Sequence, residues 1–181
     1  MRIAKATLTS RWAWATGLAA LVFAVLAYLD YRLKALTAVS TADLSGFSEL
    51  VQFQAAIVVW RPQDFAIRAG FNLGLDYLLM PLYAASFFYS GIVAAEGLTP
   101  RPGLPRRILM AAIWVPLTGA LADAVENGLF LTMLLNGANQ TLLGIAAMAS
   151  SIKTVALLIG LLLLLGAVMA KFQERRSGKR F

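Results

Sequence analysis

The stretch TVALLIGLLLLLGAVMAK, residues 154–171, decides the class of protein that this sequence encodes. It contains five consecutive leucines at 161–165 and carries no charge before Lys171. A helix needs about 20 mainly apolar residues to cross the hydrocarbon core of a bilayer. Residues 145–169 therefore predict a membrane-spanning helix, and the basic residues that follow mark its end.

Composition places the whole chain in the same class. Of its 181 residues, 60% are hydrophobic and 14% are charged, whereas soluble domains have about 45–50% and ~25%. The formal charge of +7 does not indicate nucleic-acid binding, because the basic residues cluster beside apolar runs, as membrane anchors do. The sequence has no cysteine and no histidine, which excludes disulfides, thiol catalysis and imidazole chemistry. We expect no cofactor and no metal.

Three further segments meet the length criterion for a span. They cover residues 12–29, 73–95 and 108–135. The first follows a basic N-terminus, as a signal peptide would, but its length and the lack of a following cleavage site favour an uncleaved anchor. Four spans predict an all-α integral membrane protein, a four-helix bundle that forms one membrane domain over residues 1–181.

The distribution of lysine and arginine predicts the orientation. Basic residues concentrate in the cytoplasmic loops of membrane proteins. With a cytoplasmic N-terminus, eleven basic residues fall in inside segments and four fall in the outer loops. We therefore expect both termini to be cytoplasmic. The four outer basic residues, all in the first loop, are Arg32, Lys34, Arg61 and Arg68.

The first outer loop, residues 30–72, is too long and too apolar to be a simple connector. Its segment 46–60 predicts an amphipathic helix, with Ser45 or Ser48 as the capping residue. Residues 64–72 are expected to lead helically into the second span. The amphipathic helix either lies on the outer surface, covers the end of the bundle, or acts as a lid over a site between the spans.

The segment ADAVENGLF, residues 122–130, interrupts the third span with charge. A charged side chain at the bilayer centre costs about 2.5–3.5 kcal/mol on insertion scales. Asp123, Glu126 and Asn127 stand at positions i, i+3 and i+4, which share one face of a helix. The spacing predicts one polar stripe that points into the bundle. Pro116, in the same span, is expected to free a backbone carbonyl in mid-helix.

Depth along the helices predicts partners for this stripe. Lys153 in the fourth span lies about as far from the outer surface as Asp123, so we expect an ion pair between the third and fourth spans. On the second span, Asp76 lies nearer the outer surface, and Tyr83 lies two turns deeper on the same face. Pro81 between them frees a further backbone carbonyl.

Three carboxyl groups and one lysine leave an excess of two negative charges in this region. Either a carboxyl is protonated, a cation or cationic ligand binds, or water enters from the outside. Each alternative makes the region a candidate site for a ligand or a proton, with no catalytic role assigned. The candidate residues are Asp76, Tyr83, Asp123, Glu126, Asn127 and Lys153.

These residues also carry a resemblance. The second span has an L-D-x-x-x-x-P-x-Y pattern from Leu75 to Tyr83, the third has D-x-x-E-N from Asp123, the fourth has Lys153, and the outer loop reaches Trp60. In these features the chain resembles a family of small four-span bacterial membrane proteins to which no activity is assigned. The resemblance implies a multi-pass protein of the bacterial inner (plasma) membrane, in which the polar residues form one site.

Three functions and one structural role stay open. The first function is binding of an amphiphile, or docking to a larger complex as an accessory subunit. The second is a membrane-embedded enzyme for a lipid or isoprenoid, with Glu126 or Asp123 as general acid and Asp76 as base. There Tyr83 and Asn127 would orient the substrate. The third is proton- or cation-coupled transport by an oligomer, and the structural role is an ion pair that locks helix packing.

The expected partners follow from these functions. They are the lipid bilayer itself, a lipid or isoprenoid-like ligand, and either a second copy of the chain or a larger membrane complex. Nucleic acid is not an expected partner. Whether the protein is an enzyme stays open.

Overall fold

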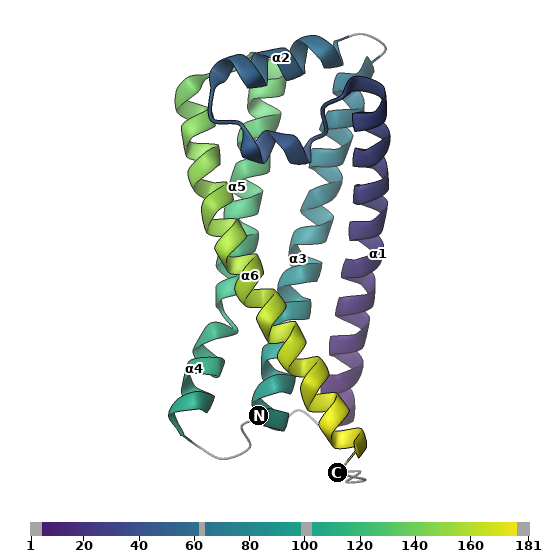
Figure 1. Ribbon diagram of the computed structural model, residues 1–181, viewed down its shortest axis with the longest axis vertical. Helices are drawn as coiled ribbons and strands as arrows, with labels where there is room; N and C mark the ends of the chain where they lie inside the picture. Colours follow the sequence, from purple (N-terminus) through teal and green to yellow (C-terminus); the bar gives the residue numbers. More distant parts are fainter. Residues whose placement is uncertain (1–4, 62–63, 99–102, 177–181) are drawn as a thin grey trace. The chain divides into compact units, whose positions relative to one another are not determined.

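The computed structural model describes residues 5–61, 64–98 and 103–176, and over these residues the fold is an all-α four-helix bundle with a helical loop segment (Figure 1). The elements are α1 (Lys5–Thr37), the 3-10 helix η1 (Ala42–Gly46), α2 (Leu50–Trp60), α3 (Phe65–Leu98), α4 (Leu104–Ala112), α5 (Val115–Asn136) and α6 (Gln140–Arg176).

Within the described ranges, four helical segments are long and apolar enough to cross a membrane: α1, α3, α4 together with α5, and α6. Each has more than 30 residues. Large apolar side chains such as Leu121, Met148 and Leu162 are exposed on these helices, the reverse of the pattern in a soluble protein. The expected multi-pass, all-α membrane fold is confirmed. α3 begins at Phe65, so the segment expected to lead helically into the second span is continuous with it.

The third span is not one continuous helix. α4 ends at Ala112, and α5 begins at Val115 with Pro116 in its first turn. Proline fits the first turn of a helix, where a backbone N–H has no partner within the helix, and it disrupts the interior. The expectation that Pro116 lies in mid-helix is therefore wrong, because it starts a new helix. Pro81 does lie inside a helix, α3.

The chain divides into two compact units, and each contains parts of all four spans. The unit with both chain ends, here called the terminal unit, consists of Met1–Ala19, Pro81–Ala120 and Lys153–Phe181. The other, here called the cap unit, consists of Ala20–Met80 and Leu121–Ile152.

In the terminal unit, α3 and α6 approach closely through small residues. A Cβ atom added at Gly97 would collide with Ala170, and one added at Gly160 would collide with the ring of Phe87. Small residues let the backbones of membrane helices approach, because lipid supplies no hydrophobic force between the helices. Glycine is therefore required at these two positions by the closeness of the neighbouring helix.

Hydroxyl groups join α1 to α3 in the same unit. The indole Nε1 of Trp12 donates to Ser90 Oγ at 2.8 Å. One turn further along α1, the hydroxyls of Thr16 and Ser86 are 2.8 Å apart. Contacts of this kind between helices contribute about 0.6 kcal/mol each on average, so they fix the pairing of the helices more than they strengthen it.

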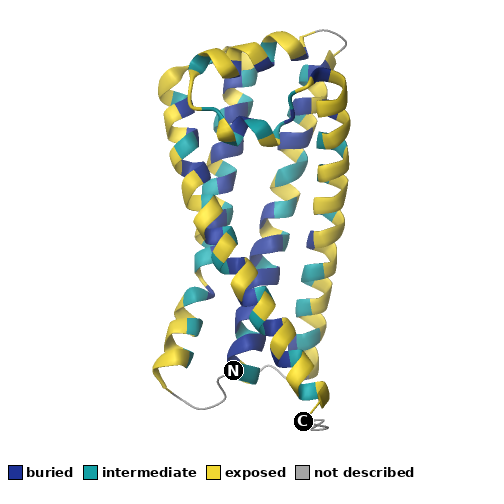
Figure 2. Cartoon of the chain, in the orientation of Figure 1, coloured by how far each residue is buried: buried dark blue, intermediate teal, exposed yellow. Residues whose placement is uncertain are grey.

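In the cap unit, α2 lies across the ends of α5 and α6 (Figure 1). Phe53 and Trp60 of α2 are fully buried, and Phe53 stacks on Phe130 of α5 with 5.9 Å between ring centroids. The backbone N–H of Leu50 donates to the side chain of Gln140 at the start of α6. Of the three arrangements that the sequence leaves open, α2 therefore packs on the bundle. Figure 2 shows its buried residues facing the helices beneath it.

The start of α2 differs from the expectation. The N-cap residue is Glu49, and Gln52 Oε1 accepts hydrogen bonds from the backbone N–H groups of Ser48 and Glu49. The expectation that the side chain of Ser45 or Ser48 caps this helix is therefore wrong. A glutamine three residues after the N-cap serves that purpose, as in a capping box.

Candidate functional site

The polar stripe of α5 is buried in the cap unit. The exposed fractions of Asp123, Glu126 and Asn127 are 4%, 0% and 3%. On the same helix Leu121 is 70% exposed and Val125 is 51% exposed. The three polar side chains thus lie on the face of α5 that turns towards protein, as their i, i+3, i+4 spacing predicts.

A side-chain hydrogen bond connects this stripe to α3. Asn127 Nδ2 donates to Asp76 Oδ2 at 2.8 Å. The neighbouring residue, Tyr77, donates from its hydroxyl to the backbone carbonyl of Ala124 at 2.8 Å. A Cβ atom at Gly128 would lie only 3.1 Å from that hydroxyl, so the glycine leaves room for the tyrosine. The sequence analysis did not identify Tyr77, because a tyrosine in a span is ordinary.

The loop between α1 and α3 reaches the stripe through Ser45. Its hydroxyl donates to Glu126 Oε1 at 2.6 Å, across 81 positions of sequence. This length lies within the usual range for an O–H···O hydrogen bond. A residue of η1, outside the predicted spans, therefore supplies a hydrogen-bond donor to a fully buried carboxyl group. No local sequence pattern indicates a contact of this range.

Asp30, near the end of α1, positions η1. Its carboxylate accepts hydrogen bonds from the backbone N–H and the hydroxyl of Thr41, at 2.8 and 2.6 Å. It also accepts from the backbone N–H of Ala42 at 3.2 Å and from Asn72 on α3 at 3.4 Å. One carboxylate thus fixes the first turn of η1 to two helices, and this turn carries Ser45 to its place.

Asp43 makes a second attachment of the loop to α1. It accepts hydrogen bonds from the backbone N–H and the hydroxyl of Ser40, and it forms an ion pair of 2.8 Å with Lys34. Burial opposes ionisation of Asp43, but the hydrogen bonds from Lys34 and Ser40 outweigh it and lower the pKa below its ordinary value of 3.8. Ionised Asp43 therefore stabilises the loop.

Two of the six candidate residues belong to the terminal unit. Tyr83 is buried there, and its ring lies 6.0 Å from that of Phe87. Lys153 is half-buried on α6, and its backbone carbonyl lies beside Gly119 of α5. The other four candidates belong to the cap unit. The ion pair of Lys153 with Asp123 stays a prediction.

The described ranges hold no group of three or more Asp, Glu, His or Cys residues placed to bind a metal ion. What the cap unit offers is hydrogen-bond acceptors, namely the carboxyl oxygens of Asp76, Asp123 and Glu126. These can accept from hydroxyl or ammonium groups, or exchange protons.

No family model matches the chain, and no curated protein or solved structure matches it. The resemblance to small four-span bacterial membrane proteins accordingly stays a sequence-based expectation.

Proposed function

We propose that the protein binds an amphiphilic ligand at the carboxyl groups of the cap unit, and that the outer loop covers this site. The observation that carries the proposal is the 2.6 Å hydrogen bond from Ser45 to fully buried Glu126. The donor comes from a loop segment outside the spans. If that segment moves away, Glu126 loses a donor in a place where water is scarce, and a donor from a ligand takes its place.

The chemistry of the acceptors defines the ligand. Carboxyl oxygens in a low-dielectric region need hydrogen-bond donors or a positive charge nearby. A hydroxyl or an ammonium group on the ligand can take the place of the Ser45 donor at Glu126. The surrounding helices expose apolar side chains, so a ligand that arrives from the bilayer has an apolar tail. A lipid or isoprenoid with a hydroxyl or amine head fits both conditions.

A membrane-embedded enzyme acting on such a lipid is the second candidate. Asp76 receives a hydrogen bond from an amide on α5, whereas Glu126 receives one from a hydroxyl of the loop. Two carboxyl groups in different surroundings can serve as the acid and the base of one reaction. In that role Glu126 would donate a proton to the lipid, and Asp76 would accept one.

The test is the amphiphile that co-purifies with the protein in a mild detergent, identified and counted by mass spectrometry. We expect about one bound amphiphile per chain for the wild type, and a loss of most of it for Glu126→Gln. This variant keeps the size and shape of the side chain. The matched control is Glu96→Gln, at an exposed glutamate of α3, which we expect to retain the ligand.

Three outcomes separate the functions. Equal amphiphile content in the wild type and Glu126→Gln would refute ligand binding at the carboxyl groups. Two co-purified lipids that differ only in the position of a double bond, with one accumulating in Glu126→Gln, would favour the enzyme. Proton uptake by reconstituted vesicles that depends on Glu126 would favour transport.

A further inference from the structure

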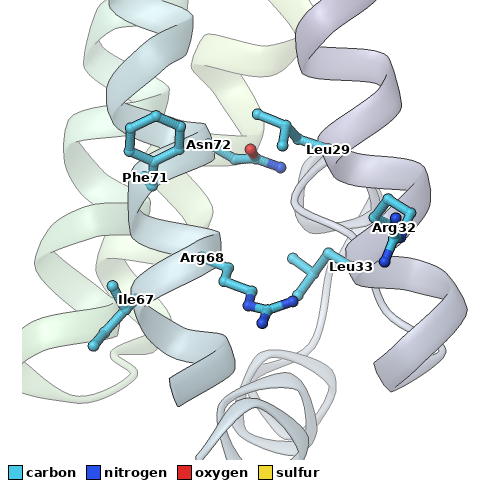
Figure 3. A pocket seen from close by; sticks show the side chains of 7 residues that line it. All are labelled: Leu29, Arg32, Leu33, Ile67, Arg68, Phe71 and Asn72. Atoms are coloured by element: carbon cyan, nitrogen blue, oxygen red, sulfur yellow. The ribbon is translucent and has the colours of Figure 1, made fainter. Parts of the chain in front are cut away.

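A second feature of the cap unit is an open cleft of about 370 Å³ between α1 and α3 (Figure 3). It lies apart from the residues of the acidic stripe, and its charged lining is basic. The lining residues are Leu29, Arg32, Leu33, Ile67, Arg68, Phe71 and Asn72.

Among the described residues, the two arginines of this cleft form no ion pair. Arg32 donates to the hydroxyl of Tyr28 at 3.0 Å, and the guanidinium of Arg68 lies over the ring of Phe65 at 5.4 Å. In the described part of the chain, no carboxylate bonds to either guanidinium. Lys34, by contrast, is paired with Asp43. Both arginines are exposed and keep their full charge available to a ligand.

Charge and apolar surface are ordered along the cleft. α1 runs towards the outer loop and α3 runs away from it, so Arg32 and Arg68 both lie at the loop end. Leu29 and Phe71 each lie three residues further from the loop, about 4.5 Å along the helix axis. Figure 3 shows Arg68 extending from α3 towards Leu33 on α1. Both arginines thus lie at the loop end of the cleft beside Leu33 and Ile67, whereas Leu29 and Phe71 lie nearer the middle of the spans.

Asp30, a carboxylate beside the cleft, is engaged elsewhere. Asn72 lines the cleft and donates to Asp30 at 3.4 Å. The oxygens of Asp30 also accept three hydrogen bonds from Thr41 and Ala42, so they are committed to the start of η1. Of the residues that line the cleft, Arg32 and Arg68 are the charged ones.

We infer that this cleft binds an anionic phospholipid. The phosphate lies between the guanidinium groups of Arg32 and Arg68, each of which can bind two phosphate oxygens at once. An acyl chain lies against Leu29 and Phe71. The inference is independent of the proposed function, because the ligand proposed there binds carboxyl groups.

The experiment compares binding of phosphatidylglycerol and phosphatidylcholine to the full chain in detergent by native mass spectrometry. We expect the wild type to prefer phosphatidylglycerol by at least about tenfold, since each arginine near a membrane surface attracts anionic lipid. The variant R32Q/R68Q should reduce this preference to about twofold or less. The matched control is R61Q, which removes one outer positive charge at a residue that does not line the cleft.

Further variants make the result decisive. R32K/R68K keeps both positive charges and should retain part of the preference for phosphatidylglycerol. If R32K/R68K instead loses as much of this preference as R32Q/R68Q, with unchanged thermal unfolding, the site requires the geometry of the guanidinium group. A wild type without preference, or an undiminished preference in R32Q/R68Q, would overturn the inference. Full displacement by inorganic phosphate would also overturn it, because it would indicate a free-anion site without a role for the acyl chain.

The same experiment separates this inference from the proposed function. Glu126→Gln should leave the preference for phosphatidylglycerol unchanged. R32Q/R68Q should leave the amphiphile at the carboxyl groups in place. A failure of one proposal therefore leaves the other testable.

Discussion

Replacing Ser45 with alanine removes the hydroxyl that donates to Glu126 Oε1 at 2.6 Å. The acceptor is fully buried, so water does not replace the lost donor. Removing the donor of a buried hydrogen-bond acceptor costs about 1–3 kcal/mol. We therefore expect Ser45→Ala to lower the free energy of unfolding by about 2 kcal/mol. For a chain of this size, that corresponds to a Tm lower by roughly 4–8 °C.

The assay is thermal unfolding of the purified protein in detergent micelles. Ser48→Ala is the matched control, because Ser48 is an exposed serine of the same loop whose backbone, not its hydroxyl, bonds to Gln52. We expect this control to change stability by less than about 0.5 kcal/mol. A double-mutant cycle with Glu126→Gln should give a coupling energy of about 1 kcal/mol or more. Equal losses for Ser45→Ala and Ser48→Ala, or a coupling energy near zero, would refute the reasoning.

Three further predictions follow from contacts elsewhere in the structure. Gly160→Ala should destabilise the protein by about 1–3 kcal/mol in thermal unfolding, because the added Cβ collides with Phe87. The control is Gly144→Ala, which should be neutral or stabilising because the space around Gly144 is open. Asp43→Asn should be less stable than the wild type above about pH 3.8. This difference in unfolding free energy should shrink as the pH falls through the lowered pKa of Asp43. A stability difference that does not change with pH would contradict this prediction. Tyr77→Phe should cost about 1 kcal/mol in the same unfolding assay, and an unchanged Tm would show that its hydrogen bond contributes nothing.

The spans could be predicted because each depends only on local composition. A run such as 154–171 has to be a membrane helix whatever the rest of the chain does, since lipid offers its backbone no other partner. The burial of Asp123, Glu126 and Asn127 was predictable for a similar reason, because helix geometry alone places them on one face. The interruption before Pro116 was not found, because a length criterion does not detect a break inside an apolar run.

The loop contacts could not be predicted from sequence. Ser45, Ser48 and Glu49 all precede α2, and local pattern does not decide which of them is the N-cap. The hydroxyl of Ser45 instead bonds to Glu126, 81 positions away. Such a pairing depends on where η1 lies in space, and that is set by Asp30 and its partners on the loop and on α3. The candidate site was therefore incomplete at its loop side.

The attachment of the loop to four different helices orders the biosynthesis of this protein. The loop leaves the ribosome soon after α1. Three residues that hold it in place are made much later. Glu126 and Gln140 bond to it directly, and Asn72 bonds to Asp30, which in turn bonds to the loop. It cannot reach its final place until α5 and the start of α6 have been inserted. Closure of the loop thus marks the placement of α5 and the start of α6, and resistance of residues 38–61 to added protease would report it.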